Sequence, residues 1–212
     1  MLFVIGGASG SGKTLNLLGL ALGRSDLIVR DEDVLGFYED FDCRWRHATT
    51  AYFVREALLH QECGRDTVLG GQLPLGEVLA APDAEAIDGI AACLLDCDDA
   101  IRIARGRIRG GPAIGRRQVE WAAFLRGHAV DPGHDRGQLR CRDDDGTMRW
   151  ERWWEWKRGD PRWDVEHVDT TDLTPDQSLH RLTIWIAAQR ALHAAGKLPL
   201  AADWWRTRVG QR

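Results

Sequence analysis

Lysine is scarce in this chain of 212 residues, because only Lys13, Lys157 and Lys197 among its 28 basic residues are lysines. Positive charge is also in deficit, since 32 acidic residues leave a formal net charge of −4. A chain with this balance has no global basic field that attracts nucleic acid or an acidic membrane surface. With so few lysines, the one inside a glycine-rich loop, Lys13, stands out.

Long hydrophobic runs are absent too. No apolar stretch approaches the roughly 20 residues that a membrane-spanning helix needs. The apolar run at residues 2–5 is too short for a signal peptide, and no basic region precedes it. The sequence therefore predicts a protein without a membrane partner.

Cysteine occurs five times, and the chain has no CxxC pair. The odd number and the missing pair argue against a disulfide framework and against a zinc knuckle. We therefore expect a protein of the reducing cytoplasm. The five are Cys43, Cys63, Cys93, Cys97 and Cys141.

Short apolar runs alternate with helical patterns, which predicts a layered α/β fold with a parallel sheet. The length fits one domain with a sizeable core. Strands are expected at residues 2–5, 27–29, 67–69, 90–95 and 165–168. Helices are expected at residues 13–22, 49–61, 98–107, 117–125 and 175–193.

One region interrupts this alternation. Residues 108–164 contain no obvious sheet strand and many charges, so we interpret them as an insertion and a candidate lid. Within it, residues 148–163 read MRWERWWEWKRGDPRW, and we call them the tryptophan-rich segment. Rings among arginines could stack on a base, but such a run more often forms a small aromatic core.

A glycine-rich loop follows the first expected strand and matches the pattern GxxxxGK[ST]. Glycines let consecutive N–H groups turn inward, and the following helix adds its positive end. Lys13 is then expected to reach the β- and γ-phosphates of a nucleotide, and the Thr14 hydroxyl to hold Mg²⁺. The loop consists of Gly7, Ala8, Ser9, Gly10, Ser11, Gly12, Lys13 and Thr14.

Carboxylates follow the second expected strand, in the run Arg30-Asp31-Glu32-Asp33. In open α/β sheets this edge borders the ligand crevice. One carboxylate can help to hold Mg²⁺, for which we choose Asp31, and one can accept a proton from an attacking hydroxyl. The alternative is a solvated acidic turn.

Two further segments follow strand ends. Gly70-Gly71-Gln72 could let a ligand approach the backbone closely, or could form a simple turn. The helix expected after the fourth strand is rich in arginine. Helical spacing puts three of these residues near one face, where guanidinium groups could stabilise a transferring phosphoryl group: Arg102, Arg105 and Arg109. The alternative is an arginine-rich solvent face.

This set of motifs resembles the small-molecule kinases of the P-loop family, which include shikimate, gluconate and adenylate kinases. Asp31-Glu32-Asp33 resembles the DxD motif of shikimate kinases, and RIARGRIRG resembles the arginine-bearing helix that enters the family's lid. The third glycine of shikimate kinases is replaced by Gln72, and their RPL motif is missing. Arg30-Asp31 also resembles the Arg-Asp step of polynucleotide 5′-kinases.

The resemblance implies a three-layer α/β/α P-loop fold with a five-stranded parallel sheet and an inserted lid, in a single domain over residues 1–212. It implies that residues 49–61 form a substrate-binding helix, in which Arg55 is expected to grip the acceptor. His47, just before this helix and beside Arg44 and Arg46, is a candidate for substrate contact, with a surface role as the alternative. It also implies that adenine binds between the arginine helix and residues 170–175, near Arg105, Thr171 and Pro175.

The sequence as a whole therefore predicts a kinase that uses ATP and Mg²⁺ to phosphorylate a hydroxyl of a small molecule. Asp31 or Asp33 would be the base, with Asp31 preferred because it lies nearer the strand end, and Asp33 would then contact the substrate or the metal shell. Lys13, Arg105 and Arg109 would stabilise the transferring group. The alternatives are a polynucleotide 5′-hydroxyl kinase and a non-catalytic ATP-binding module. The sequence indicates no oligomeric state.

Overall fold

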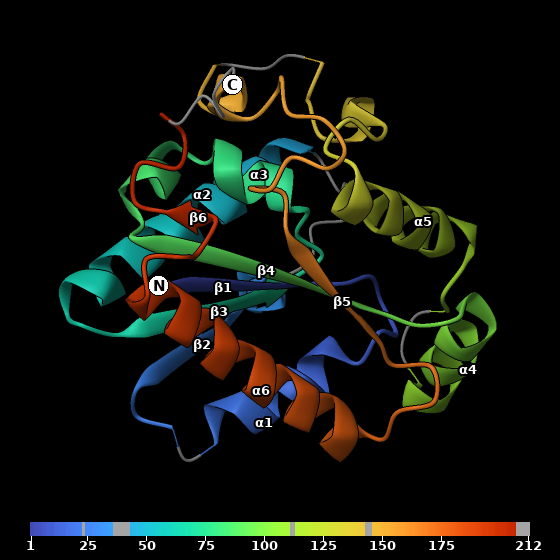
Figure 1. The fold of residues 1–212 in the computed structure, drawn as a ribbon. Coiled ribbons are helices and arrows are strands. Elements are labelled where there is room, and N and C mark those ends of the chain that lie inside the picture. The colour runs from blue at the N-terminus through green and yellow to red at the C-terminus, as the bar shows by residue number, and fades with distance from the viewer. Residues whose placement is uncertain (23, 36–42, 111–112, 143–145, 207–212) are drawn as a thin grey trace.

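Six strands form one sheet at the centre of the molecule, with helices on both faces (Figure 1). The computed structural model describes residues 1–212 except 23, 36–42, 111–112, 143–145 and 207–212. The strands are β1 (Leu2–Gly6), β2 (Leu27–Asp31), β3 (Asp66–Gly71), β4 (Gly89–Asp96), β5 (Val165–Asp169) and β6 (Leu200–Ala201). The α-helices are α1 (Lys13–Ala21), α2 (Cys43–Glu62), α3 (Leu75–Ala80), α4 (Asp99–Arg109), α5 (Arg116–Val130) and α6 (Pro175–Ala194).

The strand order is β2-β3-β1-β4-β5, and all of these neighbours pair in parallel. The expected five-stranded parallel sheet is therefore confirmed. The short β6 was not predicted, and it pairs antiparallel with β4 through Gly89 and Ile90. Because β1 lies between β3 and β4, the loop after β1 leaves the middle of the sheet's carboxyl edge.

The alternation of side chains along β1 assigns one set of helices to each face. Leu2 and Val4 belong to a core with α2, α3 and α5, whereas Phe3 and Ile5 belong to a core with α1 and α6. All four side chains are buried. A central strand that is covered on both faces reads as a continuous apolar run, which is why β1 was recognisable in the sequence.

Helix positions were predicted well and helix ends less well. The α6 helix starts at Pro175, as expected, because Thr174 and Gln177 form a capping box at its N-terminus. The α2 helix starts at Cys43 rather than at residue 49, and the short α3 was not predicted.

The described part of residues 108–164 contains no strand, as expected. Besides α5, it holds two 3₁₀ turns, η3 (Arg136–Gln138) and η4 (Trp150–Arg152). Four rings of the tryptophan-rich segment are buried, Trp153 completely. They join the core that covers the α2, α3 and α5 face: Trp150, Trp153, Trp156 and Trp163. The aromatic-core interpretation is thus confirmed.

The tryptophan-rich segment attaches to α3 through specific polar contacts. The Trp153 indole donates a 2.8 Å hydrogen bond to the Gly76 carbonyl, and the Arg149 amide donates one of 2.6 Å to the Ala80 carbonyl. A Cβ on Gly76 would overlap the Trp153 ring, so this position needs glycine. The segment is therefore packed against the sheet domain.

A disulfide joins Cys43, at the start of α2, to Cys141. Their Cα atoms lie 5.6 Å apart, within the ordinary range for such a bond. The sequence argued against a disulfide framework, and this single bridge is a correction to that expectation. A sequence separation of 98 residues carries no local signal, so only the fold brings the two cysteines together.

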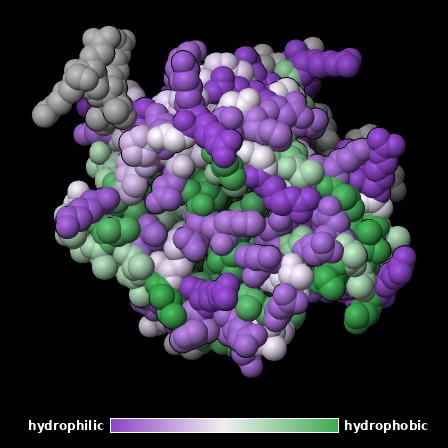
Figure 2. Space-filling view, turned by 45° about the vertical axis from the view of Figure 1, so that its right-hand side comes forward, coloured by the Kyte–Doolittle hydropathy of each residue, from purple (hydrophilic) through white to green (hydrophobic). Residues whose placement is uncertain are grey.

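No described helix is long and apolar enough to cross a membrane. In Figure 2, polar residues cover much of the face in view, with smaller apolar areas between them.

Truncation of Trp153 should be costly, because this large side chain is fully buried. We expect Trp153→Ala to lower the free energy of unfolding by about 3–5 kcal/mol, measured by urea denaturation. Trp205→Ala is the control, since Trp205 is only partly buried, and it should cost clearly less. Equal losses in the two variants would contradict an aromatic core centred on Trp153.

The disulfide predicts a count of reactive thiols. In urea without reductant the chain should show three thiols, from Cys63, Cys93 and Cys97, and after reduction it should show five. Cys141→Ser should raise the unreduced count to four, because Cys43 loses its partner. Five thiols in the unreduced wild-type protein would disprove the bridge.

Candidate active site

The predicted phosphate loop curls between β1 and α1 in a conformation that only glycine adopts readily. Gly10 and Gly12 have φ angles of +83° and +95°, in the left-handed region. The Ser11 hydroxyl is buried and has no hydrogen-bond partner. A buried hydroxyl without a partner fits a loop whose polar ligand comes from outside the chain.

Lys13 opens α1, and its side chain is buried at the loop. Its ammonium group lies 3.4 Å from the Ala8 carbonyl oxygen. Burial lowers the pKa of Lys13, while the charges of Asp33, Glu32 and Asp31 act in the opposite direction. The lysine therefore lies close to the acidic turn, and a bound polyphosphate would favour its charged form.

The acidic turn begins where β2 ends and continues as the 3₁₀ turn η1 (Glu32–Leu35). The Asp31 carboxylate accepts a 3.1 Å hydrogen bond from the Asp33 amide, so part of its capacity stabilises the turn. Asp33 is half-buried, and burial raises the pKa of its carboxyl, with the Asp31 charge adding to the shift. Lys13 and Arg109 act against this shift, which places Asp33 within the fields of both cations.

Glu32, between the two aspartates, was not among the predicted site residues. Its side chain is buried and accepts a hydrogen bond from the Gln72 amide. Burial raises the pKa of Glu32 to about 8, and the charge of Asp33 adds to this. The run Arg30-Asp31-Glu32-Asp33 did contain the signal, but only the 3₁₀ geometry shows that the middle carboxyl points inward.

The glycines after β3 lie under side chains of this chain. A Cβ on Gly70 would overlap Leu17 of α1, and a Cβ on Gly71 would overlap the Glu32 carboxyl group. Their small size is therefore explained by packing of α1 and η1 on β3. The backbone N–H of the adjacent Gln72 donates a hydrogen bond to the Glu32 carboxyl group.

The three arginines of α4 differ in what they contact. Arg102 is fully buried and binds the Ser9 carbonyl, as well as Asp96. Arg105 donates to Gly10 O at 3.3 Å and to the Thr170 carbonyl at 2.6 Å. Arg109, in the last turn, is exposed. Helical spacing predicted one shared face for the three, but Arg102 is buried, Arg105 is half-buried and Arg109 is exposed.

The predicted nucleotide-side loop lies between β5 and α6. The Thr171 hydroxyl donates to Asp169 at 2.6 Å and accepts from the Asp98 amide at 2.9 Å, so Thr171 joins this loop to the start of α4. Pro175 is the first residue of α6. The neighbouring Thr170, the first residue of the predicted loop, contacts both Arg105 and the phosphate loop.

The predicted substrate residues on α2 lie apart from one another. Arg55 is exposed. His47 is buried, and its ring donates a 2.7 Å hydrogen bond to the Leu139 carbonyl. The adjacent Arg46 forms a two-pronged ion pair with buried Glu77 and donates to the Gln138 carbonyl at 3.0 Å. The first turns of α2 therefore hold residues 138–141 of the inserted region.

A metal site made entirely of protein side chains is not found among the described residues, since they contain no suitable group of three or more His, Cys, Asp and Glu residues. Thr14 lies exposed at the start of α1, and Asp31 lies half-buried at the end of β2. Such a donor set fits Mg²⁺, which is usually held by one or two protein oxygens together with phosphates and water.

Comparison with solved structures supports the fold. A sugar kinase from Janibacter sp. HTCC2649 in unliganded form is 15% identical, with a TM-score of 0.55 over 90% of this chain and 96% of that chain. The structure named APE1195 is also 15% identical, with a TM-score of 0.52 over 89% and 95% of the two chains. No protein-family model and no curated protein sequence matches this chain. At this identity the likeness shows a kinase-like α/β fold.

The raised pKa of Glu32 has a consequence for stability. The carboxyl is protonated in the folded protein up to about pH 8, whereas in the unfolded chain it ionises above its ordinary value of 4.5. At this carboxyl the folded state therefore binds more protons over this window, so the contribution of Glu32 to the free energy of unfolding falls as the pH rises from about 5 to 8.

Glu32→Gln should remove this loss, because the amide retains an oxygen for the Gln72 N–H and does not ionise. We expect the variant to gain stability relative to the wild type from pH 5 to pH 8, measured by urea denaturation without nucleotide. Glu62→Gln, an exposed position, is the control and should show no such trend. A constant difference between Glu32→Gln and wild type across this range would contradict the buried, protonated carboxyl.

Proposed function

We propose that this protein transfers the γ-phosphate of ATP to a hydroxyl group of a small molecule, with Mg²⁺ as the metal ion. The observation that carries the proposal is the placement of Lys13 between the phosphate loop and the Asp31-Glu32-Asp33 turn. A loop that binds polyphosphate and a carboxylate that can accept a proton are the two parts that phosphoryl transfer to an alcohol needs.

In this reaction the loop amides and Lys13 hold the β- and γ-phosphates. The acceptor oxygen forms a bond to the γ-phosphorus while the bond to the bridging oxygen breaks, and the acceptor proton passes to a carboxylate. Thr14 and Asp31 would hold Mg²⁺, which neutralises phosphate charge. Arg109 adds positive charge on the side of Asp33.

Asp33 is the base that the geometry favours, although the sequence favoured Asp31. The Asp31 carboxylate is engaged with the Asp33 amide, whereas Asp33 lies in the fields of Lys13 and Arg109. The raised pKa of Asp33 also makes its carboxylate a better proton acceptor.

A small hydroxyl compound is the preferred acceptor, with sugars and polyols first, since one structural neighbour is named a sugar kinase. A polynucleotide 5′-kinase is less supported. Four rings of the tryptophan-rich segment lie in the core, where they cannot stack on bases. In addition, Arg30 of the Arg-Asp step is held by Glu56 at 2.7–3.0 Å.

The test measures ADP formation from ATP and Mg²⁺ with a panel of monosaccharides, polyols and sugar acids, and separately with 5′-hydroxyl oligonucleotides. We expect one small acceptor to stimulate turnover. Asp33→Asn should then lower kcat by about 10²–10⁴-fold, as for removal of a general base. Lys13→Ala should lower kcat more than Asp33→Asn does, and Asp31→Asn should lower it less.

Glu62→Gln is the matched control, because it removes an exposed carboxylate of α2 without touching the site. ADP formation that only oligonucleotides stimulate would contradict a small-molecule acceptor and favour a polynucleotide 5′-kinase. Tight ATP binding without stimulation by any acceptor would favour a non-catalytic binding module. Full activity of Asp33→Asn would return the role of base to Asp31.

A further inference from the structure

Side chains of α4 and of the β5–α6 loop donate hydrogen bonds to carbonyl groups of the phosphate loop. Three consecutive carbonyls, those of Ser9, Gly10 and Ser11, each lie within hydrogen-bond distance of such a donor. In a curled loop, carbonyls held on the outer side favour an inward direction for the N–H groups that the loop does not use itself; the Ser11 N–H is used, because it donates to the Ala8 carbonyl at 3.2 Å. The orientation of the loop amides is therefore set by residues outside the motif.

Arg102 makes the strongest of these contacts. Its guanidinium donates to the Ser9 carbonyl at 2.7 Å and to the Cys97 carbonyl at 3.2 Å, and it forms an ion pair with Asp96. The side chain is fully buried. A Cβ on Gly10 would meet the Cγ atom of Arg102 at 2.9 Å, so loop and arginine stem are packed directly together.

Thr170 and Arg105 hold the next two carbonyls. The Thr170 hydroxyl lies 3.0 Å from both Ser11 O and Asp96 O and can donate its proton to either. It also accepts a 3.0 Å hydrogen bond from Arg105, which donates to Gly10 O and to the Thr170 carbonyl as well. These contacts join the β5–α6 loop and α4 to the same stretch of backbone.

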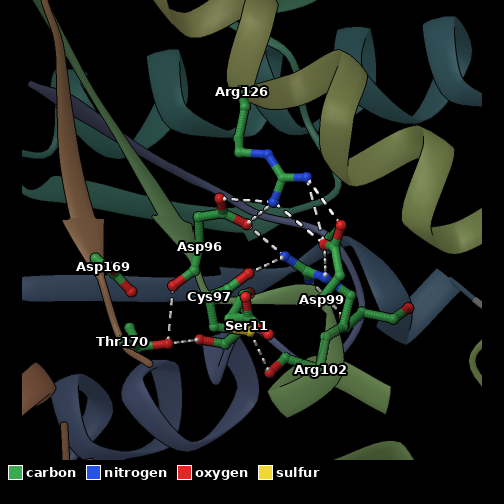
Figure 3. Close-up of polar contacts among 12 residues, drawn as sticks. Ser11, Asp96, Cys97, Asp99, Arg102, Arg126, Asp169 and Thr170 are labelled. Carbon is green, nitrogen blue, oxygen red and sulfur yellow. Dashed lines mark hydrogen bonds and ion pairs between the residues drawn. The ribbon is translucent and has the colours of Figure 1, made fainter. Parts of the chain in front are cut away.

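Asp96 fixes the direction of Arg102, and it is itself held from a second side (Figure 3). Arg126 of α5 donates to Asp96 at 3.1 Å and to Asp99 at 3.2 Å. In Figure 3, Arg126 reaches the two aspartates from above while Arg102 approaches from the phosphate-loop side. Arg102 is thus oriented by a carboxylate that is shared with the inserted region.

We propose that Arg102 is a positioning residue that orients the amides of the phosphate loop for the nucleotide's phosphates, and that Thr170 assists it. The role rests on the proposed function, because it concerns how this loop binds ATP. Arg102 does not touch the reacting atoms; it acts through the carbonyls of the loop. Its charge also reaches the site, since it is one of the groups that lower the pKa of Lys13.

The first experiment compares Arg102→Met, Arg102→Lys and the control Arg107→Met, an exposed arginine of the same helix. Affinity for the fluorescent nucleotide mant-ATP with Mg²⁺ is measured at a temperature where urea titration shows each variant to be folded. We expect Arg102→Met to weaken binding at least about tenfold and Arg107→Met to leave it within about twofold. Arg102→Lys should recover only part of the loss, because lysine lacks the planar fork.

Thr170→Val and Thr170→Ser form a milder pair that keeps the buried arginine. Valine removes the hydroxyl that binds Ser11 O, so it should weaken mant-ATP binding several-fold, whereas serine should bind like the wild type. This pair tests the inference even where Arg102→Met does not fold.

Amide hydrogen exchange without nucleotide separates this inference from the proposed function. Loss of Arg102 should speed exchange at residues 9–12 while β1 and β4 stay protected. Wild-type mant-ATP affinity in folded Arg102→Met, or unchanged exchange at these amides, would overturn the inference. Failure of the wild type itself to bind mant-ATP would instead overturn the proposed function, and the exchange result would still decide the role of Arg102.

Discussion

The buried ion pair between Arg102 and Asp96 stands where strand β4, helix α4 and the phosphate loop meet. A fully buried guanidinium is costly unless its donors are satisfied. Here it has the Asp96 carboxylate and the carbonyls of Ser9 and Cys97 as acceptors. A phosphate loop does not need such support to bend, because its glycines already permit the curve. What the pair adds is a fixed direction for the Ser9 carbonyl, and with it a preferred direction for the loop N–H groups.

The acceptor side of the molecule is organised by packing of the inserted region. Residues 138–141 are held by Arg46, by His47 and by the disulfide, all from the first turns of α2. The tryptophan-rich segment is held by α3 through Trp153. A lid that closes over the site would therefore have to carry α2 and α3 with it, or leave these segments in place. Helix α5 is held as well, because Ala122, Phe124 and Leu125 belong to the sheet core and Arg126 pairs with Asp96 and Asp99.

The sequence predicted those features that local patterns determine. The phosphate loop, the five parallel strands and the N-terminus of α6 each depend on a short run of residues whose geometry is fixed by glycine, by burial or by a capping box. The disulfide, the Arg46–Glu77 pair and the contact of Thr170 with Ser11 join residues 31–159 positions apart, so no local pattern records them.

Side-chain direction was the second kind of information that the sequence lacked. The spacing of Arg102, Arg105 and Arg109 predicted that they share one helix face, yet whether each side chain meets solvent or protein depends on where α4 docks. The same holds for Glu32, because a 3₁₀ turn sends neighbouring carboxyls in different directions. Residue types at strand ends therefore predicted where a site would lie, while the contacts of each side chain required the fold.

The charges at the site constrain which carboxylate serves the proposed reaction. Burial disfavours the charged form of Lys13 and also that of Glu32. A bound polyphosphate would act oppositely on the two groups, since its negative charge favours the lysine cation and keeps the Glu32 proton in place. The net result is a charged lysine on the phosphates and a neutral Glu32 on the Gln72 amide. Under this proposal Asp33 is the carboxylate that the η1 turn leaves unengaged, and the charges of Lys13 and Arg109 favour its ionised form.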